Sequence, residues 1–300
     1  MNIIILTEPT EKFVCCGQSQ NVSAEIDVKF CKKNNIGYTR RIAGGTTVFL
    51  DENQIFYNVI LYGYNFPTPL KALYKKSLKG PIDFYNSLKL EAFLNNYNEI
   101  SVENRKISGI GAYCLEKTGL VVGNIILDFD YDMCVKALRF PSENFKSLFR
   151  RYLENSVTSI KRELQKEIPK DEIYDGLIST FEKNLNIKLV EDKLTNWEIK
   201  KNKELEKEYQ TEKWLNPHRE DMKKEKIFVK IRKGQFIFHY TPLSAEFVIE
   251  NKKITEIICD SSLKEVSTLK GINIDEISEK NSLFRDLKKN LLKFQVLSEN

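Results

Sequence analysis

The stretch RRIAGGTTVFLD, residues 40–51, joins two arginines to two adjacent glycines and a segment rich in β-branched side chains. Glycine has no Cβ, so the backbone of such a loop can approach a ligand closely. Backbone N–H groups and fixed guanidinium charges together are typical of phosphate binding. Residues 46–51 favour a strand after the loop. The stretch therefore predicts a glycine loop that enters a sheet, and either phosphate binding or a plain sheet-forming turn explains it.

The composition is that of an ordinary globular chain of 300 residues, with 41% hydrophobic and 30% charged side chains. This length suffices for one large domain and a smaller one. The apolar start MNIIIL is too short for a signal peptide or a membrane span, and no later run reaches that length. The six cysteines lack the spacing of a zinc site or a disulfide framework. We therefore expect a cytoplasmic protein whose cysteines are small core residues.

The net charge of +5 is unevenly distributed, because lysines gather between residues 193 and 233. Many acidic side chains are mixed with them, which is typical of a solvated helix or linker rather than of a nucleic-acid groove. We expect a monomer that binds neither nucleic acid nor membrane. Its basic surface can still attract an acidic protein partner.

Hydrophobic periodicity divides the chain into strands and helices. The predicted strands cover residues 11–17, 46–51, 55–64, 119–132, 226–241, 246–251 and 253–259. The predicted helices cover residues 24–35, 68–89, 143–164 and 170–185, with a break or kink at Gly80-Pro81. This order predicts an α+β domain over 1–192, a charged linker over 193–222 and a small α+β domain over 223–300.

Histidine is nearly absent, since only His218 and His239 occur and both lie beyond the first predicted domain. Ser-His-Asp, Cys-His and histidine-rich metal chemistry are therefore disfavoured in that domain. Adenylation needs no side-chain base, because lysine, backbone N–H groups and magnesium can hold the phosphate charge. The first domain favours chemistry of this kind.

A second glycine-containing stretch supplies a lysine. In ENRKISGIGAYC, residues 103–114, Lys106 precedes Ser108, Gly109 and Gly111. An ammonium group there would lie beside backbone that can approach a ligand. Taken alone, such a stretch is more often a hairpin turn than a site.

Four motifs in this order resemble the lipoate-protein ligase A family, which is related to biotin ligases and to lipoyl and octanoyl transferases. They are GQSQN at 17–21 with Glu25 beyond it, RRIAGGTTVFLD at 40–51, RKISG at 105–109 and ILDFD at 126–130. The resemblance covers roughly residues 13 to 190. TEKWLNP, residues 211–217, resembles the segment with which longer family members enter an accessory C-terminal domain.

The resemblance implies a biotin/lipoate ligase-like α+β fold with mixed or antiparallel sheets flanked by helices, followed by a small accessory domain. It also implies a reaction in two steps. The carboxylate of lipoate attacks ATP, with magnesium present, to form lipoyl-AMP. The lipoyl group then passes to a lysine of a lipoyl carrier domain, which is the expected protein partner.

The family's site residues are carried over only where the motifs match. Lys106 is expected to reach the acyl carbonyl and the phosphate oxygens, where negative charge builds up. Phe129 is expected to line the adenine through its backbone. Residues expected to hold the adenylate are Arg41, Gly44, Gly45, Thr46, Thr47, Val48 and Phe49. Secondary candidates are Arg40, which could pair with an acid, Asp128 and Asp130, which could contact magnesium or ribose or be buried structural carboxylates, and Cys114.

The sequence departs from the family pattern at three places. Thr46 replaces the third glycine of the loop, Leu50 replaces a histidine, and Val122-Gly123 stands where the family has His-Gly. Threonine restricts the loop to negative φ, so the position of Thr46 tests whether the loop can cradle phosphate.

Three other functions remain open at the level of sequence. Octanoyl or lipoyl transferases share the scaffold without using ATP, and Cys114, taken to lie near Lys106, could form a thioester. A biotin ligase is disfavoured by the double arginine and by RKISG. A scaffold that only binds an acylated carrier would release no pyrophosphate.

Overall fold

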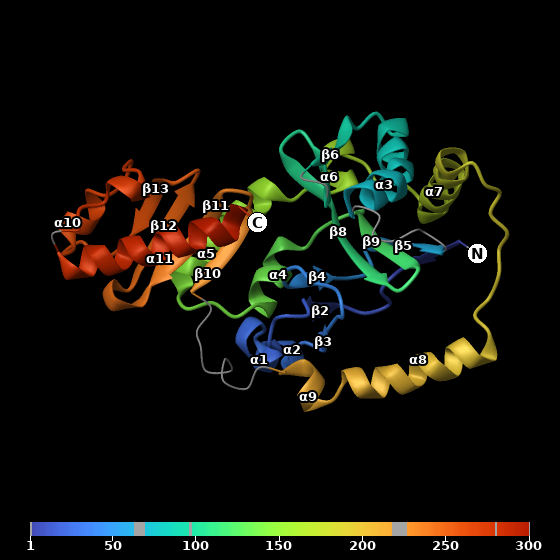
Figure 1. Ribbon diagram of the computed structural model, residues 1–300, viewed down its shortest axis with the longest axis horizontal. Coiled ribbons are helices and arrows are strands. Elements are labelled where there is room, and N and C mark those ends of the chain that lie inside the picture. The colour runs from blue at the N-terminus through green and yellow to red at the C-terminus, as the bar shows by residue number, and fades with distance from the viewer. Residues whose placement is uncertain (1, 63–69, 96–97, 218–226, 280, 300) are drawn as a thin grey trace. The chain divides into compact units, whose positions relative to one another are not determined.

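The computed structural model describes residues 2–62, 70–95, 98–217, 227–279 and 281–299. Two compact units divide the chain (Figure 1). The first comprises Met1–Ala137 and Val157–Met222, and the second comprises Leu138–Ser156 and Lys223–Asn300. The second unit therefore includes a segment from the middle of the chain. The predicted domains 1–192, 193–222 and 223–300 stay a prediction, and residues 218–222 of the linker lie outside the described residues.

A six-stranded antiparallel sheet forms the body of the first unit. Its strand order is β1-β5-β9-β8-β7-β6. The strands are β1 (Ile3–Thr7), β5 (Gln54–Tyr62), β6 (Ala92–Asn95), β7 (Glu99–Val102), β8 (Arg105–Leu115) and β9 (Thr118–Ile126). The start MNIIIL thus supplies an edge strand, and the strand predicted over 119–132 ends earlier, at Ile126.

Alternate side chains of β5, including Ile55, Tyr57 and Val59, point to one face of this sheet and are fully buried. Helices α3 (Leu70–Ser87) and α7 (Lys170–Leu185) cover that face, which we call the helix face (Figure 1). The predicted break at Gly80-Pro81 is wrong, because α3 continues through it. A Cβ on Gly80 would lie 2.8 Å from the ring of Phe181 in α7, so glycine permits the two helices to pack closely.

A three-stranded mixed sheet, in the order β3-β2-β4, carries the arginine and glycine motifs. Its strands are β2 (Phe13–Cys16), β3 (Gly37–Arg40) and β4 (Val48–Leu50). β2 and β3 are parallel and need a crossover, which α1 (Val22–Glu25) and α2 (Val28–Lys33) provide. Asp27 separates these two helices, because its side chain accepts from Phe30 N and caps α2. The predicted α+β class with mixed and antiparallel sheets is confirmed.

The single helix predicted over 143–164 is two helices, α5 (Glu143–Ser156) and α6 (Ile160–Leu164), preceded by α4 (Tyr131–Ala137). Val157 forms an isolated parallel bridge with Lys106 instead of continuing α5. Ser159 then caps α6 by accepting from Arg162 N. Pairing with the sheet therefore overrides the helical pattern at Val157.

The charged segment 193–215 forms α8 (Asn196–Tyr209) and α9 (Glu212–Leu215). A capping box between Thr195 and Glu198 begins α8, which buries none of its residues. Trp197 is 71% exposed. The solvated helix expected from the mixed charges is therefore confirmed for α8, whereas α9 packs against β3.

The second unit is a four-stranded antiparallel sheet backed by α11 (Ser282–Glu299) (Figure 1). Leu287, Leu291 and Phe294 of α11 enter its core. Helix α5 packs on β10 and β11, and Arg151 pairs with Glu256 at 2.6 Å. The remaining elements are β10 (Phe228–Arg232), β11 (Gln235–Tyr240), β12 (Ala245–Glu250), β13 (Lys253–Ile258), α10 (Lys264–Ser267) and two 3₁₀ turns at Thr241–Leu243 and Ile274–Glu276.

None of the helices in the described part of the chain combines the length and apolar character that a bilayer span requires.

Candidate active site

Arg41 shapes the loop between β3 and β4 from inside. Its guanidinium donates to Gly44 O at 2.8 Å and to Thr46 O at 2.9 Å. A third bond runs to Cys15 O in β2 at 3.1 Å. We call residues 41–47 the arginine loop. The three hydrogen bonds from Arg41 to carbonyls stabilise the curved backbone of this loop. The expected adenylate-binding role of Arg41 stays a prediction, and the structure adds this bracing role.

The arginine loop has one position that requires glycine. Gly45 has a φ of +95°, which is strained for other residues. Thr46 is not among the residues with positive φ, so threonine fits where the family has its third glycine. Gly44, Gly45 and Thr46 are exposed, so their backbone is accessible to a ligand.

The GQSQN motif lies directly against the arginine loop. Gln18 N donates to Ala43 O at 3.0 Å. A Cβ on Gly17 would lie only 1.9 Å from Gly45 O, so the two backbones are in close contact. Gln20 Oε1 accepts from Gly17 N at 2.9 Å and from Thr47 Oγ1 at 3.0 Å. Two motifs that are separated in sequence therefore form one structure.

Arg40 has a different environment from Arg41. Its side chain is buried and donates to the carbonyls of Gln18 and Trp214. The guanidinium lies 4.4 Å from the centre of the Trp214 ring, and Trp214 Nε1 donates back to Arg40 O at 2.7 Å. Arg40 is thus bonded to backbone and stacked on an indole, and it fixes the TEKWLNP segment to β3. The expected acid is not among the partners observed for Arg40 in the described part of the chain, which are two carbonyls and an indole.

Lys106 lies in β8, not in a turn. The pairing of β7 with β8 shifts between Ile100 and Ser101, which leaves Ile107 as an extra residue in β8. Ile107 and Ser108 are both fully buried, and Ser108 meets Tyr57 of the helix face at 3.2 Å. Because a bulge changes the alternation of side chains, Lys106 points to the opposite face, which we call the site face.

Gly109 and Gly111 lie on the site face together with Lys106, since Ile110 and Ala112 pack on the helix face. A Cβ on Gly111 would lie 3.9 Å from the Cβ of Ala43. The arginine loop therefore lies over the middle of β8, as expected if both glycine stretches serve one ligand.

A buried polar chain links β4 to β8 beneath the arginine loop. Gln54 Nε2 donates to Phe49 O at 3.2 Å, and Asn124 Nδ2 donates to Gln54 Oε1 at 2.9 Å. Asn124 Oδ1 accepts from Gly109 N at 2.8 Å. Burial raises the pKa of Asp51, which also accepts from Gln54 at 3.4 Å. The sequence carries no signal for Gln54 and Asn124, because an isolated amide in a strand has no distinguishing pattern.

Lys106 has an acidic partner that the sequence did not reveal. Its Nζ lies 3.2 Å from Glu99 Oε2, and its backbone O accepts from Thr158 N at 2.8 Å. The Lys106 side chain is 38% exposed, whereas that of Glu99 is 17% exposed. The lysine is therefore held at one side of the site and remains accessible.

The residues of ILDFD have local partners. Asp128 pairs with Lys161 at 3.0 Å, and Asp130 accepts from Met133 N at 2.9 Å at the start of α4. The ring of Phe129 makes an edge contact with that of Phe49, with centroids 6.5 Å apart. Phe129 thus ties the end of β9 to β4, while its expected backbone contact with adenine stays a prediction.

Magnesium has no protein-only site among the described residues, where no group of three or more potential ligand side chains gathers. Asp128 and Asp130 are engaged with Lys161 and with the backbone of α4. The expected contact of these carboxylates with magnesium or ribose stays a prediction, and we assign no step to a metal bound by these two residues.

Cys114 lies at the opposite end of β8 from Lys106. Eight residues of extended strand separate them by on the order of 25 Å. Alternation also places Cys114 on the helix face, where burial and then the proximity of Cys114 raise the pKa of Tyr74 in α3. The expectation that Cys114 lies near Lys106 is therefore wrong, because RKISGIGAYC is one strand and not a compact turn.

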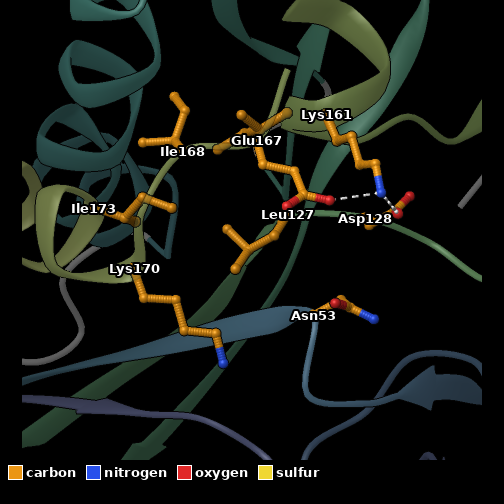
Figure 2. A pocket seen from close by; sticks show the side chains of 9 residues that line it. Asn53, Leu127, Asp128, Lys161, Glu167, Ile168, Lys170 and Ile173 are labelled. Carbon is orange, nitrogen blue, oxygen red and sulfur yellow. Dashed lines mark ion pairs between the residues drawn. The ribbon is translucent and has the colours of Figure 1, made fainter. Parts of the chain in front are cut away.

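A cavity of about 200 Å³ opens beside Asp128, on the side of α6 and α7 (Figure 2). Figure 2 shows Lys161 between Asp128 and Glu167, with ion pairs of 3.0 and 2.8 Å. Ile160 and Ile173 of its lining belong to the core of the helix face. None of the arginine-loop residues and neither Lys106 nor Gly109 lines it, so this cavity is not the site described above.

The fold and the site together define an enzyme of the biotin and lipoate ligase superfamily. The chain belongs to the lipoyl protein ligase A/B catalytic domain family, whose sequence profile matches residues 1–182. The chain is thus an enzyme of a family whose members include proteins named octanoyltransferase and lipoate-protein ligase.

Relatives named for two different activities share the same identity with the chain, but the match to the octanoyltransferase is longer. Octanoyltransferase LipM of Anoxybacillus flavithermus is 27% identical over 224 residues, which are 66% of this chain and 80% of the relative. The probable lipoate-protein ligase A of Mycoplasma genitalium is 27% identical over 154 residues, which are 50% of this chain and 44% of the relative.

Solved structures support the fold. A bi-partite lipoate protein ligase from Thermoplasma acidophilum, described with its lipoyl domain, has a TM-score of 0.66 and 24% identity, covering 71% of this chain and 83% of that one. LipL1 of P. falciparum in complex with lipoate has a TM-score of 0.54 and 17% identity, covering 99% of this chain and 87% of that one.

Proposed function

We propose that the protein is a lipoate-protein ligase. It activates lipoate with ATP to form lipoyl-AMP and then transfers the lipoyl group to a lysine of a carrier domain. The observation that carries this proposal is the absence of a usable thiol beside Lys106. An acyl group that cannot be held as a thioester must be activated in another way, and adenylation does so without a nucleophilic side chain.

The six cysteines all lie within the described residues, so this point can be checked one by one. Cys15, Cys16, Cys31 and Cys134 are buried, and Cys259 belongs to the second unit. Burial raises the pKa of Cys15 in spite of the neighbouring Arg41, which disfavours the thiolate. Cys114 is exposed but lies at the far end of β8.

The residues of the site have distinct roles in the proposed reaction. Backbone N–H groups of the exposed residues Gly44, Gly45 and Thr46 bind phosphate oxygens, in a loop that Arg41 and Gly17 hold in shape. Lys106 stabilises charge on the oxygens around the reacting carbonyl in both steps, because its ammonium faces the same side of the sheet as Gly109 and Gly111. Magnesium enters with ATP, bound mainly by its phosphates.

The carrier is a folded lipoyl domain that presents a lysine. A partner of this kind is supported by the T. acidophilum ligase, which is described with its lipoyl domain. The net charge of +5 favours encounter with an acidic carrier and makes the rate sensitive to salt. The protein acts in the cytoplasm, where ATP and carrier are both available.

The second candidate function is ATP-independent octanoyl transfer. The similarity to octanoyltransferase LipM, which extends over 80% of that relative, favours it. Some such transferases take the acyl group on a cysteine, and Cys114 is the exposed thiol among the described residues of the first unit.

One assay separates the two candidates. Purified protein is given an apo carrier domain with either lipoate, ATP and magnesium or an octanoylated carrier without ATP. The ligase makes lipoylated carrier only in the first mixture, and product in the second mixture alone establishes the transferase.

A further inference from the structure

Glu99 is held in place by more than its ion pair. Its Oε1 accepts from Asn95 Nδ2 at 2.7 Å and from Ser101 Oγ at 3.3 Å. Its Oε2 lies 3.2 Å from Lys106 Nζ. One oxygen of the carboxylate is therefore fixed to the β6-β7 hairpin, and the other is directed at the lysine.

The strand pairing explains why these groups meet. Glu99 lies opposite Gly109, and Ser101 lies opposite Lys106, on either side of the irregular pairing. Opposite residues of paired strands share a face, so Glu99, Ser101 and Lys106 all point to the site face. With regular pairing of β7 and β8, Ile107 would lie opposite Ser101 and Lys106 opposite Val102. Val102 belongs to the core of the helix face, so Lys106 would then face that core and could not reach Glu99 on the site face.

An ammonium group has three donors. The ion pair with Glu99 therefore leaves donors of Lys106 for oxygens of a ligand on the site face. A lysine side chain that is 38% exposed would otherwise sample many rotamers, and ordering it opposes catalysis. The pinned carboxylate limits that sampling before substrate arrives.

We propose that Glu99 is a positioning residue that orients Lys106 for its action on the acyl-phosphate oxygens. The inference deepens the proposed function and rests on it. Glu99 does not touch the reacting atoms, and its effect passes through the lysine. Asn95 supports the same arrangement by fixing the other oxygen of the carboxylate.

A double-mutant cycle tests this role. Glu99→Gln is expected to lower kcat for lipoyl-AMP formation by about 10- to 100-fold, the scale on which misplacement of a catalytic group acts, with a smaller change in KM for ATP. In the Lys106→Ala background the same substitution should have no further effect, because the group that it positions is gone. A merely structural role predicts equal losses in both backgrounds, and that result overturns the proposal.

A matched control lies at the other end of β7, in the turn to β8. Glu103 is 70% exposed and pairs with Arg105 at 3.0 Å, so Glu103→Gln makes the same charge change away from the lysine. Its effect on kcat should be less than about threefold. If Glu99→Gln lowers the unfolding temperature, Asn95→Ala provides a milder test. It should lower kcat by less than Glu99→Gln does, and it should have no effect on kcat in the Lys106→Ala background.

The outcome for wild type separates this inference from the proposed function. Wild type that forms no lipoyl-AMP contradicts the proposed function, and the cycle is then measured on octanoyl transfer, where coupling of Glu99 to Lys106 is expected again. Wild type that is active, with Glu99→Gln equal to it, contradicts only the role of Glu99.

Discussion

The two ends of β8 carry the two residues on which alternative chemistries depend, and their surroundings differ. Lys106 lies on the site face, where Glu99 holds its side chain and Thr158 its backbone. Cys114 lies next to the β8-β9 hairpin, pairs with Gly119 and is exposed. The arginine loop covers β8 at Gly111, between these ends.

This difference indicates which end of β8 is built for chemistry. A catalytic group needs neighbours that fix its position, and Lys106 has them. A nucleophilic cysteine needs a positive charge or a base nearby to form the thiolate, and Lys106 lies on the order of 25 Å along the strand from Cys114. The comparison therefore favours activation by ATP over a thioester.

The largest effect is expected at the lysine. Lys106→Ala should slow lipoyl-AMP formation by about 10²–10³-fold, because removal of one donor to a developing oxyanion has effects of this size. Single-turnover formation of the adenylate, measured with saturating ATP and lipoate, checks it. Wild-type rates in this variant, with the fold intact, would mean that RKISG is only a strand.

The next effect concerns the backbone contact that holds the arginine loop over β8. Gly17→Ala would place a Cβ 1.9 Å from Gly45 O, so the loop or β2 must shift. We expect a loss of about 1–3 kcal/mol in the free energy of unfolding, as for other overpacked sites, together with weaker ATP binding. Denaturant unfolding measures the change in free energy of unfolding, and calorimetry measures the change in ATP affinity.

Gly44→Ala is the control for stability, because its added Cβ would meet no atom within 4 Å. Its free energy of unfolding should change by less than about 0.5 kcal/mol. Equal losses in both variants would show that the Gly17 contact does not hold the loop.

A smaller effect distinguishes the two arginines. Arg41→Ala removes three bonds within the loop and should raise the apparent constant for ATP about tenfold, as expected for the loss of a charge-assisted bond. Arg40→Ala should instead lower the stability, because it leaves Trp214 without its cation and the carbonyls of Gln18 and Trp214 without this donor. Steady-state kinetics and thermal unfolding of both variants test whether Arg41 acts on ATP binding and Arg40 on stability. Equal effects of the two variants on ATP binding would contradict this assignment.

The smallest effect is expected at the other end of β8. Cys114→Ser should leave adenylate formation and acyl transfer unchanged, since the thiol lies on the helix face and away from Lys106. Mass spectrometry of wild type incubated with an acyl donor serves as the control. A trapped thioester at Cys114, with loss of transfer in the serine variant, would favour the transferase.

Local patterns were enough to predict much of the fold. The strands at β2, β4 and β5 and the helix α7 follow from alternation and from helical periodicity. The arginine loop, GQSQN and the Lys106 strand, which the sequence presents only as separate motifs of one family, lie together through the contacts of Ala43 with Gln18 and Gly111.

Features that depend on pairing between distant residues could not be predicted in this way. Val157 leaves a helical pattern because it pairs with Lys106, and the bulge at Ile107 depends on the register with β7. Both set the direction of Lys106, and neither has a signal in its own segment. The partner of Arg40, Trp214, is 174 residues away in sequence.

The most direct test of the central claim is pyrophosphate release from lipoate, ATP and magnesium in the absence of any carrier. The account predicts a burst of pyrophosphate with lipoyl-AMP retained on the enzyme, a burst that is lost in Lys106→Ala and kept in Cys114→Ser. No pyrophosphate from wild type, together with octanoyl transfer between carriers without ATP, would contradict it.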